Sequence, residues 1–222
     1  RPDSSNILVD LGNNPDQRAG APFAQNMQAL GVSKSEIDAI VITHPHPDHV
    51  GGPEAWKQDT LAWGQAPSEW EALPVYVPAQ MAQAGAILAS DPTSIRPDVA
   101  TTGVIAYPEV FPLSLFKPRG GEQALIVHVE GQGLVLITGC GHPGLEKLVT
   151  RAEAMYNLPV AGVVGGLHYG TMDEEGLAVP IQFLRDRQPR LVALSPHDSG
   201  PQALAAFEAA FSDRYHTLRV GE

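Results

Sequence analysis

The chain has 222 residues, of which 43% are hydrophobic and 18% are charged. This composition is typical of a globular protein with a sizeable core, and we predict one domain over residues 1–222. The net charge of −11 argues against nucleic-acid binding, because phosphate recognition usually needs a basic surface. No run of 18 apolar residues exists, so we expect no membrane span.

The cellular compartment stays open from the sequence. Cys140 is the one cysteine, so no internal disulfide can form, and both a cytoplasmic and an exported protein fit. The chain begins at Arg1 without an initiator Met, so we expect an upstream segment to be removed or missing and the N-terminus of the domain to be trimmed. The sequence does not indicate an oligomeric state.

The first half of the chain alternates short apolar runs with polar turns. Three apolar runs bounded by turn residues predict strands, at residues 6–12, 37–42 and 74–78. Residues 22–30 predict a helix that ends at Gly31, and residues 33–36 match a capping box. The segment 90–112 is rich in Pro, Thr and Asp and has no clear period, so we expect a long surface loop or an edge segment that helps to shape a pocket.

The second half begins with a hairpin pattern and continues with alternating strands and helices. Two apolar runs, 124–129 and 134–138, flank the turn residues Glu130–Gly133. Helices are then predicted over 143–156, 174–187 and 202–211, and strands over 160–164, 191–194 and 217–220. This order favours an α/β (α+β) architecture in which helices cover stacked sheets, an αββα layering.

The strongest chemical signal is Thr43-His44-Pro45-His46-Pro47-Asp48-His49, directly after a predicted strand. With 8 His in 222 residues, a shuffled chain would contain this pattern about one time in a thousand or less. Imidazole and carboxylate suit Zn²⁺, Fe²⁺ or Mn²⁺. Four donors this close cannot all reach one ion from a loop, so we expect two ions, with His44 and His46 on one and Asp48 and His49 on the other. A histidine cluster at the surface or in the core is the alternative, and the ordered spacing argues against it.

Three later strands end in glycine-rich loops that carry further donors. These donors are Cys140, His142, His168 and His197. A single such histidine more often has a structural hydrogen bond, but three loops at one sheet edge favour a site shared with the first motif. Cys140 has two interpretations, a thiolate that binds or bridges metals and a small buried side chain. We assign no role to His128, inside a strand, or to His216.

These motifs resemble those of the metallo-β-lactamase superfamily. The run Thr43–His49 with Gly51-Gly52 is similar to the main metal motif, and Val9–Gly12 is similar to the early Asp-x-Gly turn. Three later segments resemble a narrower group, the dihydropterin/ribofuranosyl-aminobenzene 5′-phosphate synthase-like metal-dependent hydrolases: 138–144, 165–168 and 195–200. The chain differs from that group at Gly141, where the group has Ser, and at Asp198, where it has Cys. Cys140 stands where the superfamily usually has a bridging Asp.

The resemblance implies an αββα sandwich with a dinuclear metal site at one edge of the sheets. His44, His46 and His142 would hold the first ion, and Asp48, His49 and His197 the second. Cys140 would lie between the ions or just outside them. We expect two divalent cations, zinc first, with manganese and iron as alternatives.

The resemblance also implies a hydrolase in which the two metals activate a water molecule. Asp48 would orient the water or accept a proton, and His168, assisted by Tyr169, would contact the substrate at the open face. The expected substrate is a small ester, lactone or phosphate compound. The alternative is a redox or sensor protein that binds metal on the same fold without hydrolytic turnover.

Overall fold

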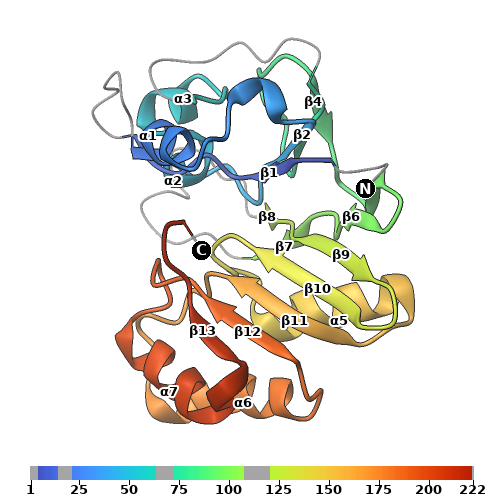
Figure 1. Ribbon diagram of the computed structural model, residues 1–222, viewed down its shortest axis with the longest axis vertical. Helices are drawn as coiled ribbons and strands as arrows, with labels where there is room; N and C mark the ends of the chain where they lie inside the picture. The colour runs from blue at the N-terminus through green and yellow to red at the C-terminus, as the bar shows by residue number, and fades with distance from the viewer. Residues whose placement is uncertain (1–4, 15–21, 64–72, 108–120, 222) are drawn as a thin grey trace.

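The computed structural model describes residues 5–14, 22–63, 73–107 and 121–221. Two sheets lie face to face, and helices cover their outer faces, which gives four layers (Figure 1). The smaller sheet is parallel and contains, in spatial order, β1 (Ile7–Val9), β2 (Ala39–Val41), β3 (Val75–Val77) and β4 (Ala86–Leu88). The αββα layering predicted from the order of elements is therefore confirmed.

The larger sheet has the strand order β13-β12-β11-β10-β9-β6-β5. Its parallel half consists of β10 (Gly133–Thr138), β11 (Val160–Gly165), β12 (Leu191–Leu194) and β13 (Tyr215–Thr217). Its antiparallel half consists of β9 (Leu125–Val129), β6 (Val99–Thr101) and β5 (Thr93–Arg96). The short strands β7 (Ile105–Ala106) and β8 (Gly121–Glu122) pair separately.

Two sets of helices flank the sheets. The smaller sheet is covered by α1 (Pro22–Ala29), α2 (Pro47–Val50) and α3 (Pro53–Lys57). The larger sheet is covered by α5 (Leu145–Tyr156), α6 (Glu174–Arg185) and α7 (Pro201–Phe211). Single 3₁₀ turns lie at Lys34–Glu36 and Ser212–Arg214. Among the described residues, no helix is both long and apolar enough to cross a membrane.

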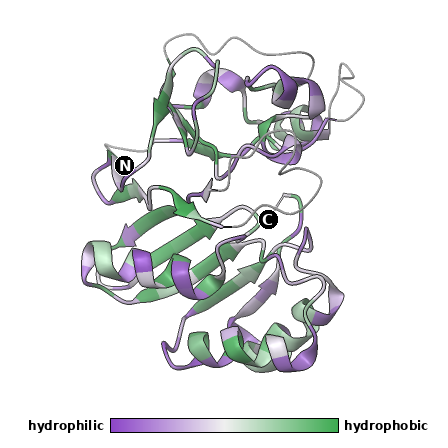
Figure 2. Cartoon of the chain, turned by 180° about the vertical axis from the view of Figure 1, so that it is seen from behind, coloured by the Kyte–Doolittle hydropathy of each residue, from purple (hydrophilic) through white to green (hydrophobic). Residues whose placement is uncertain are grey.

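The cores follow from the alternation of side chains along each strand. In β2, Ile40 faces the core beneath α1–α3, while Ala39 and Val41 face the other sheet. Both faces of β2 are covered, so the strand is fully buried. A strand buried on both faces is apolar throughout, and β2 has no polar residue. The strands of the larger sheet are likewise mostly hydrophobic, whereas the helices also carry hydrophilic residues (Figure 2).

Most predicted elements are present, with boundaries that differ by a few residues. The segment 90–112 is the main correction, because its described part contains β5, β6 and β7 rather than one long loop. Residues 93–101 form a tight hairpin in which Asp98 has a φ of 64°. These strands are too short to show a hydrophobic period in the sequence. The alternative expectation, an edge segment, agrees with β5, which lies at the edge of the larger sheet. Residues 108–112 lie outside the described residues.

Candidate metal centre

The motif loop joins β2 to α2 at the carboxyl end of the smaller sheet. Pro47 occupies the first turn of α2, where a missing N–H costs nothing, and Gly51 ends the helix with a φ of 97°. A Cβ on Gly51 would lie 2.1 Å from the carbonyl oxygen of Ala62, so only glycine fits there. The single helical turn therefore stays closed and carries Asp48 and His49 on a fixed backbone.

One group of donors consists of three histidines. His44, His46 and His142 offer ring nitrogens that all lie within 4.8 Å of one another. His44 and His46 come from the loop after β2, and His142 comes from the loop after β10. Burial lowers the pKa of His46 to about 4, with a further contribution from the charge of His142. The pKa of His44 is also well below its usual value, mainly because the ring is completely buried.

The tautomer of His44 follows from its neighbours. The Thr43 hydroxyl donates to Asp10 Oδ2 at 2.8 Å, so its oxygen can only accept the hydrogen of His44 Nδ1, 3.1 Å away. This leaves Nε2 of His44 as an acceptor. Nε2 of His44 and Nε2 of His46 are buried and lack a hydrogen-bond partner within the described residues. Unpaired buried nitrogens are costly unless a cation or water occupies the space between them.

Glu122, on β8, orients the ring of His142, the third histidine of this group. Its carboxylate is fully buried and accepts hydrogen bonds from the backbone N–H groups of Gly141 and His142, from the Thr138 hydroxyl, and from His142 Nδ1 at 2.9 Å. Burial alone would raise the pKa of Glu122, but its hydrogen bond with His142 and the charge of that ring lower it overall. The ionised carboxylate therefore directs Nδ1–H of His142 inward and leaves Nε2 for a metal.

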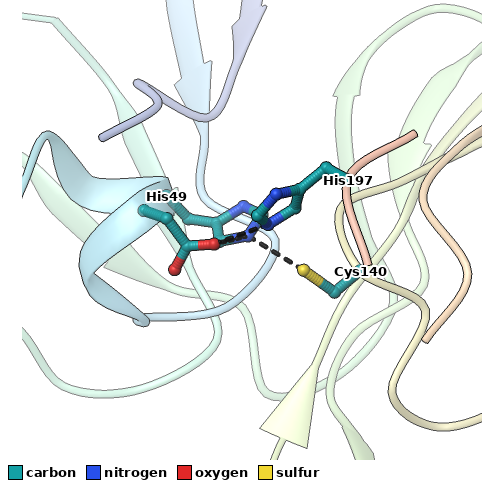
Figure 3. A group of neighbouring side chains, drawn as sticks. His49, Cys140 and His197 are labelled. Carbon is teal, nitrogen blue, oxygen red and sulfur yellow. Dashed lines mark hydrogen bonds and ion pairs between the residues drawn. The ribbon is translucent and has the colours of Figure 1, made fainter. Parts of the chain in front are cut away.

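A second group contains one carboxylate, one thiol and two imidazoles. The donors of Asp48, His49, Cys140 and His197 lie within 4.8 Å of one another. His49, Cys140 and His197 approach one another from α2 and from the loops after β10 and β12 (Figure 3). Cys140 Sγ is 3.1 Å from His49 Nε2, and Asp48 Oδ2 is 2.7 Å from His197 Nε2.

Asp10 orients this second group. Its carboxylate accepts hydrogen bonds from the Thr43 N–H, from the Thr43 hydroxyl and, at 2.7 Å, from His49 Nδ1. Burial alone would lower the pKa of His49, but the charge of Asp10 and its hydrogen bonds raise it well above the usual value. Asp10 thus performs for His49 the role that Glu122 performs for His142.

Asp48 and Cys140 have opposite pKa shifts. Burial would raise the pKa of Asp48, but hydrogen bonds with His49 and His197 hold it well below its ordinary range. Burial raises the pKa of the Cys140 thiol to about 12, although the hydrogen bond to His49 partly opposes this shift. The carboxylate is therefore ready to bind a cation, whereas the thiol would have to lose its proton on binding.

The two groups together fit divalent cations. Imidazole, carboxylate and thiolate are the ligands of zinc and related metals. Nε2 of His44 and Nε2 of His46 belong to the first group and have no hydrogen-bond partner among the residues that the structure describes. All seven predicted ligands lie in these groups. His142 lies with His44 and His46, and His197 lies with Asp48 and His49, as the resemblance implies. Cys140, expected between the ions or just outside them, lies in the second group.

Comparison with known proteins identifies the family of this chain. A family model described as the metallo-beta-lactamase superfamily matches residues 1–145. The chain belongs to the metallo-β-lactamase superfamily.

Two known proteins resemble the chain along most of its length. A protein of Methanocaldococcus jannaschii named 7,8-dihydropterin-6-methyl-4-(β-D-ribofuranosyl)-aminobenzene-5′-phosphate synthase is 24% identical over 237 residues, covering 90% of this chain and 79% of the relative. The crystal structure of Tm1679, a metal-dependent hydrolase of the β-lactamase superfamily, matches with a TM-score of 0.69 and 19% identity, covering 98% of this chain and 87% of the other.

A more distant structure shares the metallo-β-lactamase fold. An isothiocyanate hydrolase from Delia radicum gut bacteria has a TM-score of 0.53 and 14% identity, covering 84% of this chain and 75% of the other. These structural neighbours agree with the fold class predicted from the sequence.

The two remaining predicted site residues, His168 and Tyr169, differ in burial. His168 is exposed, its ring lies 4.7 Å from that of His142, and its Nδ1 is 3.4 Å from Asp198 Oδ2. Tyr169 instead packs against Phe207 in the core, and its hydroxyl accepts the N–H of Leu145. The structure brings His168 to the edge of the centre, and the position of Tyr169 gives no support to the expected contact with substrate.

Three carboxylates at the centre were not singled out from the sequence. Asp10 had a signal in the Asp-x-Gly turn that ends the first predicted strand, but it was assigned no role. Asp198, with a φ of 56°, lies 3.3 Å from Cys140 Sγ and was noted only as a difference from the related group. Glu122 is a lone acidic residue without a motif, and its one signal is a charge shortly before an apolar strand.

Proposed function

We propose that this protein is a dinuclear metal-dependent hydrolase that acts on a small ester, lactone or phosphate compound. The observation that carries the proposal is the convergence of seven side chains that could bind metal in two adjacent groups, with buried nitrogens that have no partner among the described residues. Membership of the superfamily and the hydrolases among its structural neighbours support the same activity.

Each group is assigned one divalent cation, with zinc as the first candidate and manganese or iron as alternatives. His44, His46 and His142 would hold one ion, and Asp48, His49 and His197 the other, with Cys140 as a further ligand. Bound there, the ions supply Lewis acidity, which lowers the pKa of water and polarises the reacting oxygen of a substrate.

The protein side chains orient the reaction around these ions. Asp48 is ionised and already accepts hydrogen bonds from His49 and His197, so we assign it the orientation of the attacking water or the acceptance of its proton. His168 has about half of its side chain exposed and can donate a hydrogen bond to a developing negative oxygen.

The first experiment is the metal content of protein purified without chelator, measured by elemental mass spectrometry. We expect about two ions per chain and a loss of metal in His44→Ala. His128→Ala is the matched control, because His128 also pairs with a carboxylate but lies half-buried on β9, outside the two groups of donors. Esters, lactones and phosphoesters are then tested with the loaded protein.

Two results would oppose the proposal. Near-zero metal in the wild type, even after metal is added back, would remove the basis for hydrolysis and favour a protein without turnover. Two iron ions that change oxidation state, together with no hydrolysis of any compound class, would favour the redox alternative.

A further inference from the structure

A groove opens beside the second group of ligands. It is a cavity of about 420 Å³ at the carboxyl ends of β1, β10, β11 and β12. Asp48, His49 and His197 line it, so it is continuous with the candidate metal centre. A molecule bound at the second ion would therefore extend directly into this groove.

The inner face of the larger sheet forms the floor of the groove. Ile137 and Val164 are register partners on β10 and β11, and both side chains are half-buried. Leu218, just beyond β13, and Val9 of β1 complete the apolar lining. Gly139 and Gly166 also line the groove and add no side chains to it.

The charge of the groove restricts what can occupy it. Its charged side chains other than histidine are Asp10 and Asp48, and no Lys or Arg is among the described residues that line it. Cations do line another cavity of this chain, where Lys147 and Arg151 project from α5. An anionic group in the groove would lose hydration without gaining a cationic partner and would face carboxylates.

We infer that this groove binds the non-reacting part of the substrate and that this part is neutral and apolar, such as an alkyl chain. The inference rests on the proposed hydrolase function, since the metal centre sets where the reacting bond lies. It narrows the substrate class: an ester or lactone with an aliphatic chain fits the groove, whereas a phosphate group does not.

The test uses two inhibitors that share a metal-binding head and differ at the tail. Hexanohydroxamic acid ends in a methyl group, and adipic acid monohydroxamate carries a carboxylate in place of that methyl. Their dissociation constants with the metal-loaded full chain are measured by isothermal titration calorimetry, which does not depend on turnover. We expect the neutral compound to bind at least about tenfold more tightly, because an unpaired buried carboxylate is costly.

A charge placed in the groove should invert this preference. Leu218→Arg adds a cation to the lining, and we expect it to shift the ratio of the two dissociation constants about tenfold toward the adipic compound. Val220→Arg is the matched control: it adds the same charge two residues later, at an exposed position outside the groove, and should leave the ratio unchanged.

The outcomes separate this inference from the proposed function. Equal binding of both compounds, or equal ratios in Leu218→Arg and Val220→Arg, would overturn the groove inference and leave the metal centre in place. Binding of neither compound would show that no accessible metal centre forms, and would overturn the proposed function together with the inference.

Discussion

Nδ1 of His142 donates to Glu122 Oε2 at 2.9 Å, and the Glu122 side chain has no exposure to solvent. The carboxylate lies beneath the loop that carries two candidate ligands and accepts its backbone N–H groups as well as the ring. The orientation of His142 is therefore determined by a residue that is not itself among the candidate ligands.

Glu122→Gln should weaken the binding of the metal ion held by His44, His46 and His142. The amide keeps the shape of the side chain but replaces one acceptor with a donor, which would oppose an N–H group of the loop or the ring of His142. We expect the affinity for one ion to fall about 10- to 100-fold, measured by competition with a chromophoric chelator. Asp98→Asn removes a comparable carboxylate–histidine pair from the surface and should have no effect. Unchanged affinities in Glu122→Gln would contradict the orienting role.

Asp10→Asn should weaken the binding of the metal ion held by the second group. Asp10 has a φ of 58°, a conformation that Asn tolerates better than most residues, so the backbone should be retained. The amide has no negative charge to orient His49, and with its oxygen toward the Thr43 hydroxyl and His49 its NH2 group would face the Thr43 N–H. The expected loss is again about 10- to 100-fold. Combining this change with Glu122→Gln should lower the affinities of both ions, whereas each single variant lowers one. If both variants weakened the same ion, the division into two groups would be wrong.

The metal-free protein should lose stability as the pH falls from about 6.5 to about 4. His46 has a pKa of about 4 in the folded state and His44 one well below 6.5, so the unfolded chain binds more protons in this range. The free energy of unfolding should fall by at most about 1.4 kcal/mol per pH unit for each histidine. The raised pKa of His49 contributes stability that is lost only above pH 6.5, so it does not oppose this trend.

Urea unfolding of chelator-treated protein at about pH 6.5 and about pH 5 measures this dependence. His46→Gln should reduce the pH slope by about one proton, because glutamine does not titrate. His216→Gln removes an exposed histidine of β13 and serves as the control. A stability that rises on acidification would refute the expected sign.

Cobalt substitution should decide between the two interpretations of Cys140. Its sulfur lies 3.1 Å from His49 Nε2 inside the second group, so we expect a thiolate-to-cobalt charge-transfer band in the near ultraviolet. Cys140→Ala should abolish the band while the visible bands of the bound cobalt remain. A wild-type spectrum without the charge-transfer band would assign Cys140 to the role of a small buried side chain.

The sequence predicted the candidate ligands better than it predicted the residues that orient them. The seven donors follow strand ends, and strands of one sheet present those ends at a common edge, so their meeting could be inferred. Glu122 reaches His142 only through the pairing of two-residue strands, which leave no periodic pattern. Tyr169 shows the converse problem: its neighbour His168 is exposed, but one residue further along the chain the side chain enters the core.

The candidate ligands belong to both halves of the sandwich, and the buried core between the sheets is small, with Ala39, Val41, Ile95 and Leu125 as its described members. His44 and His46 extend from the smaller sheet, whereas His142 extends from the larger one. An ion shared between them would tie the halves together, so the free energy of binding would add to that of folding. We therefore expect a cell that is short of the metal to lose the protein itself to proteolysis, and not only its activity.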